Sequence, residues 1–218
     1  GWLTAAGALA RKYKGDNPLF IYLPETDFDQ EKFLSDIEKS FEKNCNIVVC
    51  VSEGIHDASG TFICEYDSSV GTDTFGHKML AGCGKYLENL VRSRLGVKAR
   101  SVELNVSQRC SASLISATDQ QEAVMAGRFG VQAALKGETG KMVSFIREHT
   151  ADGAYKMICG LEDVNLICNE EKTVPVQWIT ADGSDVTDEF ISYARPLIQG
   201  SIQVPVGEDG LPAFVYRK

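Results

Sequence analysis

The sequence predicts an α/β fold, a Rossmann-like three-layer arrangement in which helices cover both faces of a parallel sheet. Two short continuous apolar runs, residues 19–23 and 47–51, have the pattern of strands that are buried on both faces. The stretch between these two runs repeats apolar residues at helical spacing. With 44% apolar and 24% charged residues, the composition is that of a globular protein with a sizeable core.

The first part of the chain alternates predicted helices and strands. Residues 2–13 repeat apolar side chains at helical spacing, and the Gly15–Pro18 turn ends this helix. After the strand at 19–23, Asp29 is expected to cap a helix whose apolar stripe includes Phe33 and Ile37. The strand at 47–51 follows. Helices between buried strands favour a parallel sheet, with ligand sites at the carboxyl ends of its strands.

The remainder of the chain continues this mixture. We expect a helix over residues 78–95 that ends at Gly96, a strand over 99–104, and a helix capped by Asp119 that runs to Leu135. Residues 142–146 and 155–158 are two further strand candidates. Residues 185–198 form the last predicted helix, and the tail from residue 203 is irregular.

Charge and cysteine usage exclude several classes of protein. The formal net charge of −8 disfavours a nucleic-acid or membrane partner, although a pair of arginines in a cleft can still bind a small anion. The seven cysteines are odd in number and form no Cys-x-x-Cys pair, so neither zinc nor a disulfide framework is expected. With no signal peptide and no membrane-spanning apolar run in this sequence, we expect a cytoplasmic location.

Three residues are candidates for ligand binding. Glu53 follows a predicted strand, where its carboxylate can accept hydrogen bonds from sugar hydroxyls; the alternative is a solvated loop acid. Arg100 and Arg109 flank one predicted strand and can form an anion site. On the residues alone, surface arginines paired with acidic neighbours such as Glu103 are the favoured interpretation of this pair.

Other catalytic motifs are absent from the sequence. His56, His77 and His149 lack the spacing of a metal site, and His77 is expected to orient its loop through hydrogen bonds. There is no G-x-S-x-G elbow and no glycine-rich loop of the nucleotide-binding types. The chain therefore has no predicted nucleotide cradle of its own.

A set of short motifs, in a fixed order over nearly the whole chain, resembles the second half of 6-phosphofructokinases. The details are most similar to the bacterial pyrophosphate-dependent branch, the diphosphate–fructose-6-phosphate 1-phosphotransferases. The motifs are residues 1–6, 22–25, 28–29, 51–55, 75–77, 103–105, 108–109, 116–123, 172–175, 178–179 and 193–198.

The resemblance implies an activity and roles for the candidate residues. The family transfers a phosphoryl group from pyrophosphate or ATP to O1 of fructose 6-phosphate, giving fructose 1,6-bisphosphate in glycolysis. Glu53 matches the acid that hydrogen-bonds the sugar, Arg109 matches an arginine on the sugar phosphate, and Arg100 matches an arginine that reaches a neighbouring subunit's site. The sugar-binding segment is expected to comprise Val106, Ser107, Gln108 and Arg109. Val106 departs from the His or Tyr of many relatives and cannot donate a hydrogen bond from its side chain.

The resemblance also implies what this sequence does not contain. The donor-phosphate loop, the catalytic base and the Mg²⁺-linked acid of the family have no counterpart here, so we expect no catalytic residue in the chain, Mg²⁺ bound elsewhere, and inactivity in isolation. The chain begins without Met inside a helical pattern, which suggests a part of a longer protein. The intact enzyme is expected to be a homo-oligomer, a dimer or tetramer.

The predicted fold is thus an incomplete phosphofructokinase fold in two parts. Residues 1–107 are expected to be a sugar-phosphate-binding α/β domain without its first strand, and residues 108–218 a helical and strand segment that packs on the missing N-terminal domain. Two other functions remain open. One is a non-catalytic sugar-phosphate-binding or assembly module. The other, a periplasmic-type sugar-binding protein, is disfavoured by the missing signal peptide and the unpaired cysteines.

Overall fold

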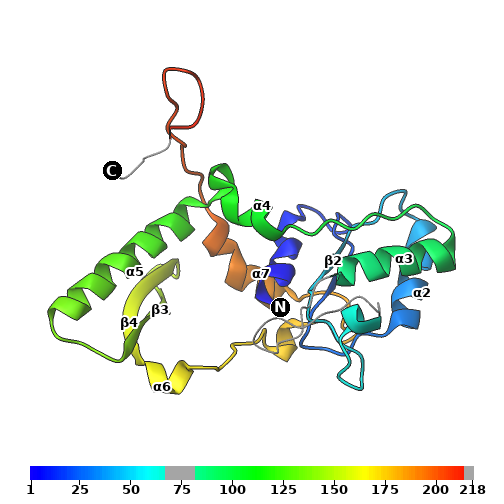
Figure 1. Ribbon diagram of the computed structural model, residues 1–218, viewed down its shortest axis with the longest axis horizontal. Helices are drawn as coiled ribbons and strands as arrows, with labels where there is room; N and C mark the ends of the chain where they lie inside the picture. The colour runs from blue at the N-terminus through cyan, green and yellow to red at the C-terminus, as the bar shows by residue number, and fades with distance from the viewer. Residues whose placement is uncertain (67–81, 214–218) are drawn as a thin grey trace. The chain divides into compact units, whose positions relative to one another are not determined.

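The computed structural model describes residues 1–66 and 82–213. The chain divides into two compact units, each with its own set of contacts (Figure 1). The first unit contains residues 1–104 and 173–194, and the second contains residues 105–172 and 195–218. The family motif at residues 75–77, with His77, and the predicted start of the helix at residue 78 lie outside the described residues.

The first unit is built around a small parallel sheet. Strand β1 (Phe20–Tyr22) pairs in parallel with β2 (Val49–Val51), so that Phe20 lies opposite Val49 and Tyr22 opposite Val51. Successive side chains of a strand point to opposite faces. Tyr22 accordingly belongs to one hydrophobic cluster, and Ile21 and Leu23 belong to another.

Helices cover both faces of this sheet. The cluster that contains Tyr22 is formed with α2 (Gln30–Phe41), the short helix η2 (Ile63–Tyr66) and α3 (Cys83–Leu95). The cluster that contains Ile21 is formed with α1 (Trp2–Ala5), η1 (Ala6–Ala10) and α7 (Asp188–Ala194). The predicted three-layer arrangement with a parallel sheet is therefore confirmed in this unit.

Residues 173–194 complete the second of these layers, although they follow the first part of the unit by many residues in sequence. Phe190 is 1% exposed and packs against Trp2 and Trp178, the latter in η4 (Val176–Trp178). The Arg11 guanidinium donates to both carboxylate oxygens of Asp185, at 2.9 and 2.7 Å. These contacts hold the two chain segments together.

The second unit consists of a long helix and a β-hairpin. Helix α4 (Asn105–Cys110) and η3 (Ala112–Leu114) precede α5 (Ala117–Leu135), which lies alongside the antiparallel strands β3 (Lys141–His149) and β4 (Tyr155–Asp163) (Figure 1). Helix α6 (Val164–Ile167) follows the hairpin, and η5 (Arg195–Ile198) contacts α5. Both predicted strands are present and extend beyond residues 142–146 and 155–158.

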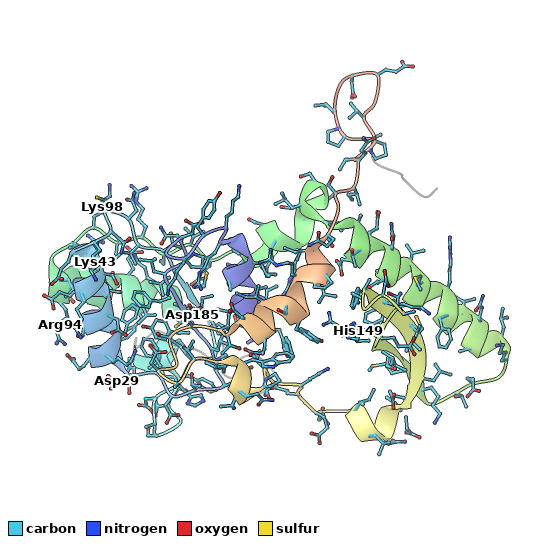
Figure 2. All side chains as sticks on the ribbon, turned by 180° about the vertical axis from the view of Figure 1, so that it is seen from behind. Asp29, Lys43, Arg94, Lys98, His149 and Asp185 are labelled. Atoms are coloured by element: carbon cyan, nitrogen blue, oxygen red, sulfur yellow. The ribbon has the colours of Figure 1, made fainter. Side chains whose placement is uncertain are left out.

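Helix caps follow the predictions only in part. The Asp29 carboxylate accepts hydrogen bonds from the amides of Glu31 and Lys32, which confirms the cap of α2; Figure 2 shows Asp29 at one end of this helix. The prediction of Asp119 as the cap of α5 is wrong. Ser116 caps the helix, because its hydroxyl accepts from the Asp119 amide at 3.1 Å, and Asp119 lies in the first turn.

Two predicted helices are shorter than the periodicity indicates. The first becomes the 3₁₀ helix η1 at Ala6, where a side chain on Gly7 would meet the Cys50 sulfur at 2.8 Å. The last begins at Asp188, because Val186 forms a β-bridge with Ile179 instead. It changes to η5 at Arg195, since Pro196 has no N–H to continue an α-helix.

The strand predicted over residues 99–104 is wrong, although its alternating pattern is real. Val97 and Ala99 pack against the core, whereas Lys98 and Arg100 are exposed. This alternation is typical of extended chain. In the described part of the molecule the segment pairs with no strand, because the Ser101 amide donates to the Glu88 carboxylate rather than to a backbone carbonyl.

Candidate functional site

Glu53 lies in a tight turn at the carboxyl end of β2. The Ser52 amide donates to the carbonyl of Tyr22, the last residue of β1, and the Ile55 amide closes the turn on the Ser52 carbonyl at 3.4 Å. Ile55 is fully buried, so the last residue of this turn is anchored in the core. Glu53, at the outer corner of the turn, is exposed. A solvent-facing carboxylate at this edge of the sheet is suited to accept hydrogen bonds from a polyol.

The segment that carries Arg100 returns along α3. Gly96, with φ +67°, ends the helix and lets the chain reverse. The Ser101 β-carbon then lies close to Gly84, since a β-carbon added at Gly84 would be 3.3 Å from it. The Ser101 amide and hydroxyl both donate to Glu88. Gly84 therefore allows a close approach of this segment to α3.

Glu53 and Arg100 both lie beside α3, Glu53 near its first residue, Cys83, and Arg100 in the segment that runs back along the helix. The pKa of the Cys83 thiol, at the first residue of α3, is raised to about 12 by burial, by the Cys64 thiol, and by the charges of Glu103 and Glu53. Glu53 is thus close enough to Cys83 to act on its charge. Arg100 precedes Ser101, which contacts the next residue of the helix, Gly84.

The other predicted site residues lie together on α4 in the second unit. Asn105 has a positive φ of 40°, and the chain turns there into a helix that carries Val106, Ser107, Gln108 and Arg109, all of them exposed. Val106 and Arg109 are three residues apart and share a face of the helix. The Ser107 carbonyl accepts from the Ser111 hydroxyl at 2.6 Å, which secures the end of the helix.

The structure therefore groups the predicted residues into two sets. Glu53 and Arg100 belong to the first unit, and residues 106–109 belong to the second. Their convergence on one ligand stays a prediction.

Arg100 also borders a hollow of about 500 Å³ that the sequence does not indicate. It is lined by Glu88, Arg92 and residues 96–100. Of these residues, Lys98 could have been recognised from the sequence as a neighbour of Arg100, because the two lie two residues apart in a segment that alternates between core and surface. The contact of Glu88 with Ser101 joins residues of different segments and has no signature in a single sequence.

Metal-binding groups do not gather in the described part of the chain. Within residues 1–66 and 82–213, no three His, Cys, Asp or Glu side chains are arranged to hold a metal ion. His56 and His149 each have a ring nitrogen close to a backbone carbonyl, of Asp57 and Gly153 respectively. These residues do not fit a Mg²⁺ site, so no chemical step of this chain is assigned to the metal. Within the same ranges, no helix combines the length and apolarity needed to cross a bilayer.

The chain was compared with protein-family models and with individual proteins, and only the individual proteins match. No protein-family model matches the chain. It is 36% identical over 218 residues to a pyrophosphate–fructose 6-phosphate 1-phosphotransferase of Xanthomonas campestris pv. campestris, covering 100% of this chain and 51% of that relative. It is 35% identical over 215 residues to the protein of the same name from Methylococcus capsulatus, covering 99% and 50%.

A solved structure agrees with these relatives. The pyrophosphate-dependent phosphofructokinase of Marinobacter aquaeolei superposes with a TM-score of 0.79 at 29% identity, over 100% of this chain and 51% of that one. The chain thus spans about half the length of the relatives that it matches. The similarity extends over all of its residues, in sequence and in fold, and on these grounds the chain belongs to the 6-phosphofructokinase family.

Proposed function

We propose that this chain supplies the sugar-phosphate-binding part of a phosphofructokinase. The intact enzyme transfers a phosphoryl group from pyrophosphate to O1 of fructose 6-phosphate, giving fructose 1,6-bisphosphate and inorganic phosphate. The observation that carries this proposal is the similarity over the full chain to pyrophosphate-dependent relatives.

Each proposed site residue has a role that follows from its chemistry. The Glu53 carboxylate accepts hydrogen bonds from the sugar hydroxyls. The Arg109 guanidinium binds the 6-phosphate with two parallel hydrogen bonds, and the Ser107 hydroxyl and Gln108 amide supply neutral donors beside it. Val106 contributes only its backbone and an apolar contact. Arg100 completes the phosphate contacts, either in the same subunit or across an oligomer interface.

The donor side of the reaction lies outside this chain. Phosphoryl transfer depends on positioned donor phosphates, a base for the attacking hydroxyl and neutralised charge. In this proposal other parts of the protein hold pyrophosphate, Mg²⁺ and the base, and the isolated chain binds sugar phosphate without turnover. ATP is the alternative donor. A homo-oligomeric, cytosolic enzyme is part of the same proposal.

A non-catalytic sugar-phosphate-binding module is the second candidate. It is favoured by the exposed, donor-rich α4. Both candidates predict that the chain binds fructose 6-phosphate. Only the first predicts turnover by the longer protein that contains it.

The deciding experiment is a steady-state assay of that longer protein with fructose 6-phosphate and either pyrophosphate or ATP. We expect turnover with pyrophosphate. The Glu53→Gln variant should lose about 10- to 100-fold in kcat/KM, because a hydrogen bond to a charged acceptor becomes a neutral one.

The matched control is Glu38→Gln, which removes a charge from an exposed residue of α2 and should leave kcat/KM unchanged. Absence of turnover with both donors would reject the enzymatic proposal. Equal kcat/KM for the Glu53 and Glu38 variants would reject the role of Glu53.

A further inference from the structure

The hollow beside Arg100 gathers three cationic side chains from two segments of the first unit. Arg92 comes from the last turn of α3, and Lys98 and Arg100 come from the extended segment that follows. Because Val97 and Ala99 pack against the core, Lys98 and Arg100 point to the opposite side of that segment. Figure 2 shows Lys98 at the edge of the first unit, and its side chain is exposed.

Two of these cations are available for a ligand. In the part of the chain that the structure describes, neither Lys98 nor Arg100 has a hydrogen-bond or ion-pair partner. Arg92 makes one long contact, 3.5 Å from Nη1 to Glu88 Oε1, which leaves the rest of its guanidinium free to donate. By contrast, the neighbouring Arg94 is engaged by both oxygens of Glu31.

The only acidic side chain that lines the hollow within the described residues is already committed to other groups. Glu88 is 9% exposed; its Oε2 accepts from the Ser101 amide at 2.9 Å and the Ser101 hydroxyl at 2.8 Å, and its Oε1 accepts from Lys85 at 2.7 Å. These bonds, to Lys85 first and then to Ser101, lower the pKa of Glu88 to about 2. The carboxylate therefore remains ionised, and keeps its hold on Ser101, as the pH falls from neutrality to well below 4.

We infer that this hollow is a phosphate-binding site in which Arg92 and Lys98 act together with Arg100, and that Glu88 is the positioning residue that holds the 97–101 segment in place. The inference rests on the proposed function and deepens it, because Arg100 is one of the proposed substrate-binding residues. Its ligand class is a phosphate dianion, free or as the monoester of a sugar. Guanidinium forks and an ammonium group are the side chains that bind such an anion. A volume of about 500 Å³ accommodates a phosphorylated sugar.

The cationic residues are tested by calorimetric titration of the 218-residue chain with inorganic phosphate at low ionic strength. We expect saturable binding, and we expect Lys98→Gln and Arg92→Gln each to weaken it by about three- to tenfold. Lys14→Gln is the matched control, since it removes one charge from an exposed lysine that does not line the hollow. Fructose 6-phosphate should displace the phosphate, and fructose should not.

Two variants of Glu88 distinguish its two possible roles, because the roles predict opposite effects of Glu88→Ala on phosphate affinity. If Glu88 acts only through its charge, Glu88→Ala removes a repulsion and tightens phosphate binding. If it positions the 97–101 segment, the same variant frees Ser101 and weakens binding. We expect the weakening, and we expect Glu88→Gln, which retains a carbonyl acceptor for Ser101, to bind at least as tightly as the unchanged chain. Circular dichroism checks that each variant is folded.

Three results would overturn the inference: no saturable phosphate binding, Lys98 and Arg92 variants that match Lys14→Gln, or tighter binding by Glu88→Ala. These outcomes are separate from those of the enzymatic proposal. Turnover by the intact protein without a phosphate effect of Lys98 would reject only this inference. Phosphate binding without any turnover would reject only the proposed reaction.

Discussion

Among individual residues, the cysteines differ most in their surroundings. Cys64 and Cys83 are buried in the core of the first unit, whereas Cys45, Cys110 and Cys168 are exposed. Burial is the largest reason for the raised pKa of Cys83, and the nearby acidic side chains add to it. Because the thiolate is the reactive form, Cys83 is expected to be inert near neutral pH.

This contrast can be measured with a thiol reagent at pH 8. The three exposed cysteines should react rapidly in the native chain, and Cys64 and Cys83 only after denaturant is added. Since the pKa of Cys83 is about 12, raising the pH to 9 should leave it unreactive. Mapping of the modified cysteines by mass spectrometry checks the assignment, and rapid native labelling of Cys83 would contradict the core described here.

Several residues could be assigned from the sequence because their signals are local. The Asp29 cap and the Gly96 helix end are of this kind, since each depends on a side chain or backbone geometry next to the helix itself. The position of Glu53 after a strand is equally local, although β2 is only partly buried and not fully buried as the apolar run predicts. Glu88, in contrast, acquires its role through Ser101, and that contact exists only after the chain has reversed at Gly96.

Among the helices and strands, α5 illustrates how a cap can connect two elements. The Ser116 hydroxyl accepts from the Asp119 amide at 3.1 Å and donates to the Leu197 carbonyl, in η5, at 2.7 Å. The Asp119 carboxylate lies in the first turn, where it interacts favourably with the helix dipole. The sequence predicts Asp119 and not Ser116 as the cap, because the contact of Ser116 with η5 lies beyond any local pattern.

We therefore expect Ser116→Ala to destabilise α5 by about 1–2 kcal/mol, since both bonds are lost. Asp119→Asn should cost only about 0.3–1 kcal/mol, from the weakened dipole interaction. Amide hydrogen exchange along α5 measures both values as free energies of local opening. An Asp119 variant more damaging than the Ser116 variant would restore Asp119 as the cap.

The prediction of a strand at residues 99–104 is wrong for a reason that also concerns the pairing of helices and strands rather than single residues. Alternating burial predicts extended chain correctly, but a strand needs a partner with free backbone groups. Here a side chain, Glu88, takes the amide that a ladder would use. The periodicity of residues 2–13 likewise identified a real helical segment. It could not indicate that the α-helix changes to a 3₁₀ helix at Ala6, where Cys50 lies close to Gly7.

For the whole molecule, alternation of helices and strands was sufficient to predict the three layers of the first unit. It was not sufficient to predict that residues 173–194 return to that unit, because their packing partners, Trp2 and Arg11, lie at the opposite end of the sequence. The predicted boundary after residue 107 and the joining of residues 106–109 with Glu53 remain predictions. The proposed function depends on the second of these.

The most direct test of that central claim is a titration of the isotope-labelled chain with fructose 6-phosphate, followed by the amide resonances in NMR spectra. We predict that the resonances of Glu53 and of residues 107–109 shift together, with one dissociation constant, and that fructose without phosphate produces no such shift. Shifts confined to one of the two groups, or to residues outside both, would contradict the account, because a shared sugar phosphate must affect both.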